Sequence, residues 1–173
     1  MVDHDLINIL NFKSKFLASR WKALIRKAPH LRHYNKMSDD DLIKINEPLY
    51  KHLARTLDRG LDRAVIGDFF VKMGKNRLER GFPLSETVFA CNLSQQMIVD
   101  YLAQEFVLDS SVAVYQTLDV TKKINEFFFL GCFYMIKGFL EKTYTEMSIK
   151  HKISEDLLKT YFKDEFFFKQ EEE

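Results

Sequence analysis

The sequence predicts an all-α fold: a single helical domain over residues 1–173 with a buried, hydrophobic central helix. Three observations support this prediction. With 6 Gly and 3 Pro among 173 residues, the chain has too few turn formers for a β-sandwich or barrel. Its composition of 46% hydrophobic and 29% charged residues is ordinary for a globular protein and excludes a disordered chain. Apolar residues also recur at three- and four-residue spacing, which is the pattern of amphipathic helices.

The N-terminal third of the chain predicts two long helices. The first covers residues 3–27 and ends before Pro29. The second begins after Ser38, whose hydroxyl can cap a helix that starts with acidic residues, and it ends at Gly60. Pro48 is expected to kink this second helix or to start another one. The apolar stripe of the first helix contains Leu6, Leu10, Leu17, Trp21 and Leu24.

Two further helices are expected at about residues 61–80 and 84–105. Gly81 ends the first of them, and the second begins either with Pro83 at its first position or with Ser85 as its cap. The residues expected on the inward face of the 61–80 helix are Val65, Phe69, Met73 and Leu78.

The longest predicted helix spans residues 111–147, with a cap at 109–111 and a break near 119–121. Residues 127–136 are apolar on every side of this helix, which predicts that it is buried all round. A last helix is expected within residues 151–173, which form a C-terminal linker or a dimerisation helix. Two glycines on the long helix would let another backbone approach closely: Gly131 and Gly138.

The residues that carry chemistry do not form a recognisable catalytic or metal-binding motif. No phosphate loop, nucleophile elbow or kinase signature occurs, so we expect no enzyme. Cys91 and Cys132 lack the spacing of zinc ligands and are interpreted as small buried hydrophobic residues. None of the five His lies on a clean apolar helix face, so neither a metal nor a haem is expected. A sensor that binds haem or another cofactor remains the alternative.

The aromatic cluster on the long helix has two interpretations. It is either ordinary core or the lining of an apolar cavity for a small hydrophobic ligand. In the second case, side chains on one face of the long helix would line the cavity, and two residues of the 84–105 helix would supply polar contacts. These pocket candidates are Phe128, Cys132, Met135, Phe139, Cys91 and Gln95.

Basic residues gather near the N-terminus, where no acidic residue occurs between residues 13 and 36. This segment is either a binding surface for nucleic acid, a membrane or an acidic partner, or simply a solvated helix face. The net charge of +1 argues against nucleic acid. The N-terminus lacks the basic region of a signal peptide and no apolar run is long enough to span a membrane, so we expect a cytoplasmic protein. The basic-surface candidates are Lys15, Lys22, Arg26 and Arg32.

Several of these features occur together in one known family. They are Trp21 on the first helix, the segment 77–86 between two helices, the aromatic run within 124–129, and the Gly-Phe-Leu-Glu end at 138–141. Together they resemble the N-terminal sensory domain of the RsbT co-antagonist proteins, over about residues 6–141. One departure is Phe129, which stands where the family pattern has an acidic residue.

The resemblance implies a globin-like domain without haem that acts as a dimeric signal-input module in bacterial stress-response or two-component pathways. A regulatory protein partner and a hydrophobic small ligand are expected with it. We expect the first helix and the Phe-rich C-terminal helix to face the second subunit. The output domain that family members usually carry does not follow here, so the chain is expected to be a stand-alone sensor or a fragment.

Overall fold

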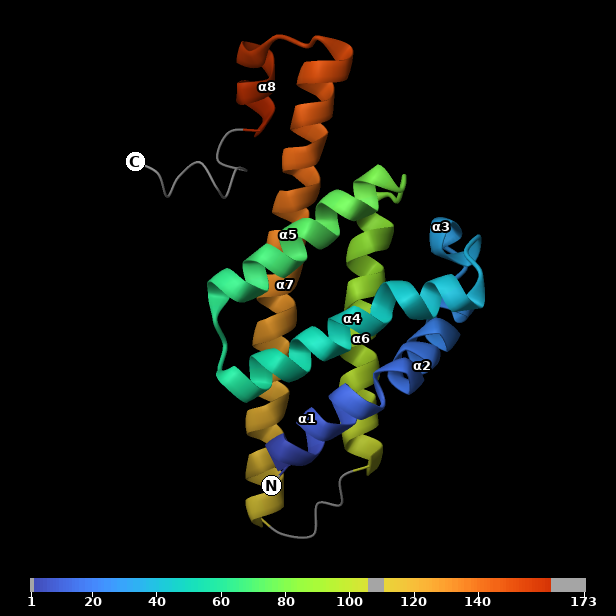
Figure 1. Cartoon of the computed structure of the whole chain (residues 1–173), viewed down its shortest axis with the longest axis vertical. Coiled ribbons are helices and arrows are strands. Elements are labelled where there is room, and N and C mark those ends of the chain that lie inside the picture. Colours follow the sequence, from blue (N-terminus) through green and yellow to red (C-terminus); the bar gives the residue numbers. More distant parts are fainter. Residues whose placement is uncertain (1, 106–110, 163–173) are drawn as a thin grey trace.

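A long helix, α7, runs along the whole molecule and organises the helices around it (Figure 1). The computed structural model describes residues 2–105 and 111–162. Helix α7 (Ser111–His151) is continuous over 41 residues, so the break predicted near residues 119–121 is wrong. The hydroxyls of Thr117 and Thr121 donate to carbonyl oxygens four residues earlier, which lets these residues remain helical. The cap predicted at residues 109–111 lies mostly outside the described residues.

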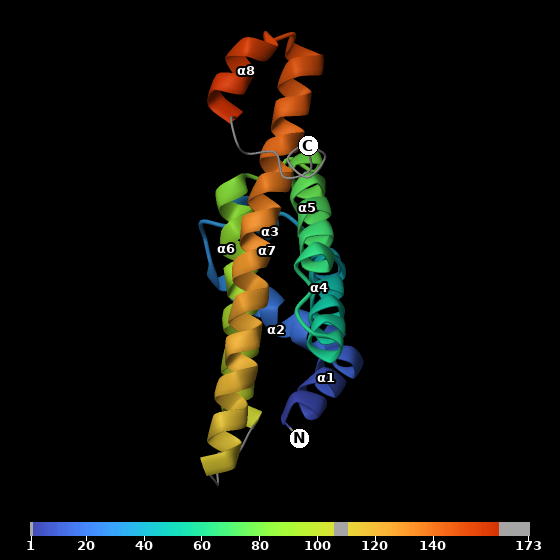
Figure 2. The same ribbon diagram turned by 90° about the vertical axis from the view of Figure 1, so that its left-hand side faces the viewer.

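The other helices are arranged in two layers. Helix α6 (Leu84–Glu105) lies beside α7 in one layer, while α1, α4 and α5 cross them in the other (Figure 2). Every regular element in the described part of the chain is a helix, which confirms the all-α prediction. None of the described helices is long and apolar enough to cross a lipid bilayer. The remaining helices are α1 (Val2–Phe12), α2 (Ser14–Lys27), α3 (Arg32–Asn35), α4 (Asp39–Arg59), α5 (Arg63–Glu79) and α8 (Glu155–Phe162).

The first predicted helix is in fact two helices, α1 and α2, separated at Lys13. Next to this break, the Ser14 hydroxyl donates to the Asn11 carbonyl (3.5 Å) and to Glu47 of α4 (3.3 Å). Hydrogen bonds of this kind, from a short polar side chain to groups outside the regular helical pattern, compete with continuation of the helix. The break lets α1 and α2 follow the surface of α4 with different directions (Figure 1).

Helix α4 begins and ends where the sequence predicted. The Asp41 N–H donates to the Ser38 hydroxyl oxygen (3.1 Å), and Gly60 after the last residue has a φ of 93°, which a residue with a side chain rarely adopts. The helix continues through Pro48 without starting a second element. Helix α6 begins at Leu84, so Ser85 is not its cap.

Helices α5 and α7 cross with their backbones in contact. A Cβ added at Gly74 would collide with the Met135 carbonyl oxygen, and one added at Gly138 would lie 2.7 Å from the Val71 Cα. A Cβ at Gly131 would collide with the Phe70 ring. The close backbone approach predicted for the glycines of α7 is therefore confirmed at Gly138, whereas Gly131 makes room for the Phe70 side chain instead. This close crossing explains why α5 and α7 form the most extensive contact in the described part of the fold.

The buried face of α5 is shifted by about one residue from the face that the sequence predicted. Val65 is 51% exposed, whereas Ile66 and Phe70 are completely buried. Gly74 and Arg77 continue this buried face. The prediction counted large apolar residues and ignored glycine, yet glycine marks the side on which α7 can approach most closely.

The aromatic segment of α7 is buried on one side only. Phe127 and Phe128 are fully buried, but Phe129 is 69% exposed and Phe133 is 51% exposed. The central position of α7 is confirmed by its contacts with both layers, but burial on every side is wrong. An exposed aromatic face is therefore left along α7.

Candidate functional site

The predicted pocket residues form part of the core rather than the lining of a large cavity. Phe128 and Met135 are fully buried, and Phe139 is 8% exposed. Gln95 donates through Nε2 to Asn125 Oδ1 (2.9 Å), which links α6 to α7. Cys91 lines a cavity of about 20 Å³, which is large enough for about one water molecule.

The structure brings the two cysteines of the chain together. Cys91 is buried on α6 and Cys132 is half-buried on α7, where its thiol also donates to Asn92 Oδ1 (3.5 Å). Hydrogen bonding between the two thiols lowers the pKa of Cys132, with burial opposing this effect. The same hydrogen bond, together with burial, raises the pKa of Cys91 well above its ordinary value. We therefore expect the two thiols to differ in reactivity, which the sequence did not predict.

A much larger hollow lies between α4 and α5, two helices that pack more closely on their other neighbours than on each other. This α4–α5 groove has a volume of about 700 Å³, which is within the range of small-molecule sites. Its apolar lining consists of Ile45, Pro48, Ala64, Val65, Phe69 and Met73. Its polar lining consists of His52, Asp68, Lys72, Asn76 and Arg77.

His52 lines the α4–α5 groove next to Phe69. Its ring stacks on Phe69 with the centroids 4.1 Å apart and the planes at 9°. Its Nε2 atom is buried and has no hydrogen-bond partner. Burial, followed by the positive charge of Arg55, lowers the pKa of His52, while a backbone hydrogen bond to Val65 and the charge of Asp68 oppose this.

Arg77 lies at the end of the groove that is closest to the core and is 7% exposed. Its guanidinium donates to the Ile45 carbonyl (3.3 Å) and to Asn76 Oδ1 (3.2 Å), whereas its Nε has no partner. Burial lowers the pKa of Arg77, and interaction with Tyr34 opposes this. Within residues 2–105 and 111–162, no carboxylate lies within ion-pair distance of this guanidinium. Arg77 is thus a buried cation that is neutralised by no described acidic group.

Sequence reasoning did not select His52 or Arg77. A signal for Arg77 was present, because it follows Ile66, Phe70 and Gly74 at helical spacing and so falls on the buried face of α5. His52 gave no such signal, since its environment is created by Phe69 from the next helix. Among the described residues, no cluster of three or more His, Cys, Asp or Glu side chains could hold a metal ion.

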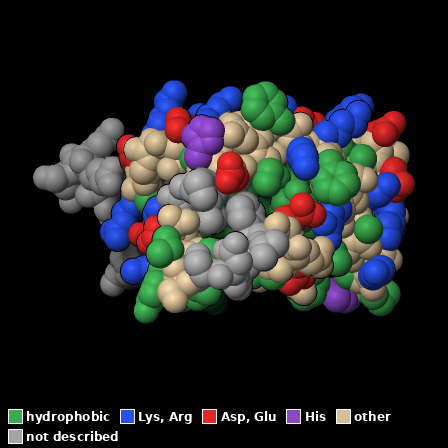
Figure 3. Space-filling view, turned by 90° about the horizontal axis from the view of Figure 1, so that it is seen from below, with side chains coloured by type: hydrophobic (Ala, Val, Ile, Leu, Met, Phe, Trp, Pro, Cys, Tyr) green, Lys and Arg blue, Asp and Glu red, His purple; other side chains and the backbone are tan. Residues whose placement is uncertain are grey.

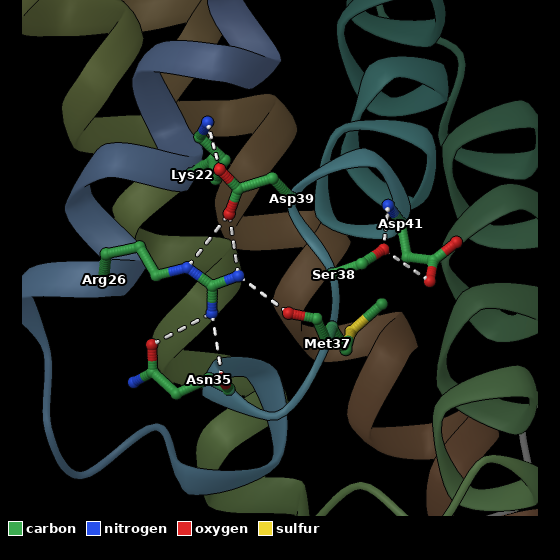
Figure 4. Close-up of polar contacts among 7 residues, drawn as sticks. All are labelled: Lys22, Arg26, Asn35, Met37, Ser38, Asp39 and Asp41. Atoms are coloured by element: carbon green, nitrogen blue, oxygen red, sulfur yellow. Dashed lines mark hydrogen bonds and ion pairs between the residues drawn. The ribbon is translucent and has the colours of Figure 1, made fainter.

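Two of the basic-surface candidates are engaged within the chain (Figure 4). Lys22 Nζ lies 2.8 Å from one carboxylate oxygen of Asp39, and Arg26 Nη2 lies 2.8 Å from the other. Arg26 also donates to the carbonyl oxygens of Asn35 (3.0 Å) and Met37 (2.7 Å). The hydrogen bonds from Lys22 and Arg26 lower the pKa of Asp39. These contacts join the end of α2 to the start of α4 and leave Arg26 little capacity for an external anion.

The other two basic candidates, Lys15 and Arg32, are exposed and lie on different elements, α2 and α3. The face shown in Figure 3 carries positive, negative and hydrophobic side chains side by side. It therefore shows no continuous basic patch of the kind that nucleic-acid binding requires.

The apolar stripe of α1 and α2 is not available to a second subunit. Leu6, Leu10, Leu17 and Trp21 are each at most 2% exposed, because they form the core of their own chain. Among the described side chains of these two helices, the large hydrophobic residues that remain exposed are Phe12 (86%) and Phe16 (52%). A contact between the first helix and a second subunit stays a prediction that cannot use this stripe, and the Phe-rich segment 166–168 lies outside the described residues.

The exposed face of α7 is the larger apolar surface. It carries Tyr115 (73% exposed) and Leu118 (61%) near the start of the helix, and Phe129 and Phe133 farther along. A hollow of about 610 Å³ lies along this face between Leu118 and Phe129, and Arg63 of α5 closes one side of it. We call Tyr115, Leu118, Phe129 and Phe133 the outer face of α7.

Comparison with known proteins gives one match. Residues 16–131 match the family described as the RsbT co-antagonist protein rsbRD N-terminal domain, which covers more than half of the chain. This range is shorter than the one expected from the sequence, and the Gly-Phe-Leu-Glu segment at 138–141 falls outside it. No curated protein and no solved structure matches the chain.

Proposed function

This chain belongs to the family of RsbT co-antagonist protein rsbRD N-terminal domains, and we propose that it is a non-catalytic signal-input domain that works as a homodimer. The family consists of input domains of stress-response signalling, which implies a regulatory protein partner. In this proposal, one domain spans the chain, acts in the cytoplasm, and passes its signal to that partner through a rearrangement of helices.

The observation that supports a dimer most strongly is the outer face of α7. Aromatic side chains such as Phe129 and Phe133 lie four residues apart on one side of the helix and remain more than half exposed. Neighbouring exposed aromatic side chains of this kind mark an interaction site on a folded protein, and Lys122 and Glu126 separate them from Leu118 along the same face. A second copy would bury this surface by placing its own α7 against it, as two-fold interfaces do.

Helix α7 also links α5 to α8, so it could transmit a movement from one end of the domain to the other. Its inner side contacts α5 through the glycines, while its last turns contact α8. Because the helix is continuous, a displacement of α5 would reach both the outer face and the C-terminal end. Packed helices with two arrangements are a common basis for such switching.

The proposal is tested by sedimentation equilibrium at micromolar concentration. We expect the wild-type chain to be a dimer and the double variant Phe129→Glu/Phe133→Glu to be a monomer with unchanged helix content, because two buried carboxylates would be introduced into the interface. Ala23→Glu, which adds the same charge at an exposed site on α2, should remain a dimer. A wild-type monomer at high micromolar concentration, or a double variant that still dimerises, would contradict the proposal.

A further inference from the structure

We propose that the α4–α5 groove binds a small organic anion, with the negative group directed to Arg77 and an apolar body of aromatic size lying against Phe69. This inference rests on the proposed signal-input function, because it names the chemical class of the input. It differs from the small hydrophobic ligand expected beside Phe128, whose side chain is fully buried.

The charge of Arg77 is the first argument for an anion. Arg77 is 7% exposed, and a guanidinium in a residue buried to this extent is normally compensated by a carboxylate or phosphate. The acceptors of Arg77 are the Ile45 carbonyl, Asn76 Oδ1 and the Tyr34 hydroxyl, and all three are neutral. The acidic residue of the groove, Asp68, is exposed and is already paired with Lys72 at 2.7 Å. The groove therefore presents a cation at its inner end without a competing internal anion.

The lining of the groove defines the rest of the ligand. Ile45, Phe69 and Met73 provide an apolar floor, while the stacked His52 ring extends the aromatic surface. Sites of this size usually combine such a lining with a few polar groups that fix orientation. A planar body with a carboxylate or a phosphate at one end satisfies both parts of the groove.

Two buried nitrogen atoms without hydrogen-bond partners belong to residues that line the α4–α5 groove. His52 Nε2 and Arg77 Nε are the buried side-chain nitrogens without partners in the part of the chain that is described, and both residues line this groove. Both atoms are closed off from solvent, so a small side-chain movement would accompany binding. An unsatisfied buried group costs free energy, and a ligand that draws Arg77 toward the groove would relieve part of this cost.

The test is a titration of isotope-labelled protein followed by nuclear magnetic resonance at the Arg77 Nε–H and His52 ring signals. The probes are 2-naphthoate, 2-naphthyl phosphate and the uncharged 2-naphthalenemethanol. We expect at least one anion to shift both sets of signals and to bind about tenfold or more tightly than the alcohol, as charge-assisted hydrogen bonds require. The two anions distinguish a carboxylate ligand from a phosphate ligand.

Two variants keep the test independent of folding. Val65→Asp places a negative charge at the half-exposed rim of the groove and should weaken anion binding about tenfold. Val112→Asp, the same change at a 65% exposed site on α7, should leave binding unchanged. Equal binding of the alcohol and both anions, no shift at Arg77, or unchanged binding by Val65→Asp would overturn the proposal.

Repeating the titration on Phe129→Glu/Phe133→Glu separates this inference from the proposed function. If that variant is monomeric and still binds the anion, the groove and the dimer contact are independent sites. If the wild type is a monomer that binds the anion, the proposed dimer fails while the groove assignment is retained.

Discussion

The two sides of α7 carry the same kind of residue in opposite surroundings. Phe127 and Phe128 are fully buried, whereas Phe129 and Phe133 lie mostly in solvent. The inner side is fixed by glycines that let α5 approach its backbone, and the outer side has no counterpart within the described chain. One face of this helix therefore stabilises the fold, while the other is left exposed for the dimer contact that we propose.

The largest effect that separates the two sides is expected from truncation of adjacent phenylalanines. Phe128→Ala should lower the free energy of unfolding by about 3–5 kcal/mol, because it leaves a cavity in closely packed core. Phe129→Ala should change it by less than about 0.5 kcal/mol under conditions where the protein is monomeric. Urea denaturation of both variants measures the difference. A denaturation midpoint that barely changes for Phe128→Ala would remove the distinction between the two sides.

A smaller and more local effect is expected at the two thiols. Cys132 should be alkylated by iodoacetamide well before Cys91, because its pKa is lowered and it is half-exposed, and only thiolates react. Its rate should reach a plateau at a lower pH than that of an ordinary thiol. Cys91→Ala removes the hydrogen bond and should move this profile to higher pH. Mass spectrometry over a pH series provides the measurement, and equal labelling of both cysteines would contradict the thiol contact.

Much of the fold could be predicted because helix ends are local. Ser38 and Gly60 carry their own signals, and the spacing of the glycines on α7 indicated a close contact. The orientation of the aromatic run could not be predicted, because residues that are apolar on every side give no preferred face. The predicted break within α7 failed because threonine hydroxyls can be satisfied inside a helix.

The candidate site was less accessible to sequence reasoning because its contacts are not local. Arg26 looked like a free cation until its partner Asp39, on another helix, was placed beside it. The α4–α5 groove depends on how far apart two successive helices lie, which no residue pattern specifies. His52 and Arg77 become notable only when their unpaired nitrogens are seen to line the same hollow.

Cysteine cross-linking tests the central claim most directly, namely that the outer face of α7 meets its own copy. In a Cys91→Ser/Cys132→Ser background, Phe129→Cys and Phe133→Cys are compared with Phe12→Cys, which is even more exposed in the single chain but lies on α1. A two-fold contact brings residues near its axis opposite themselves. Mild oxidation is expected to give a covalent dimer for Phe129→Cys or Phe133→Cys and none for Phe12→Cys. A covalent dimer from Phe12→Cys alone would contradict the claim.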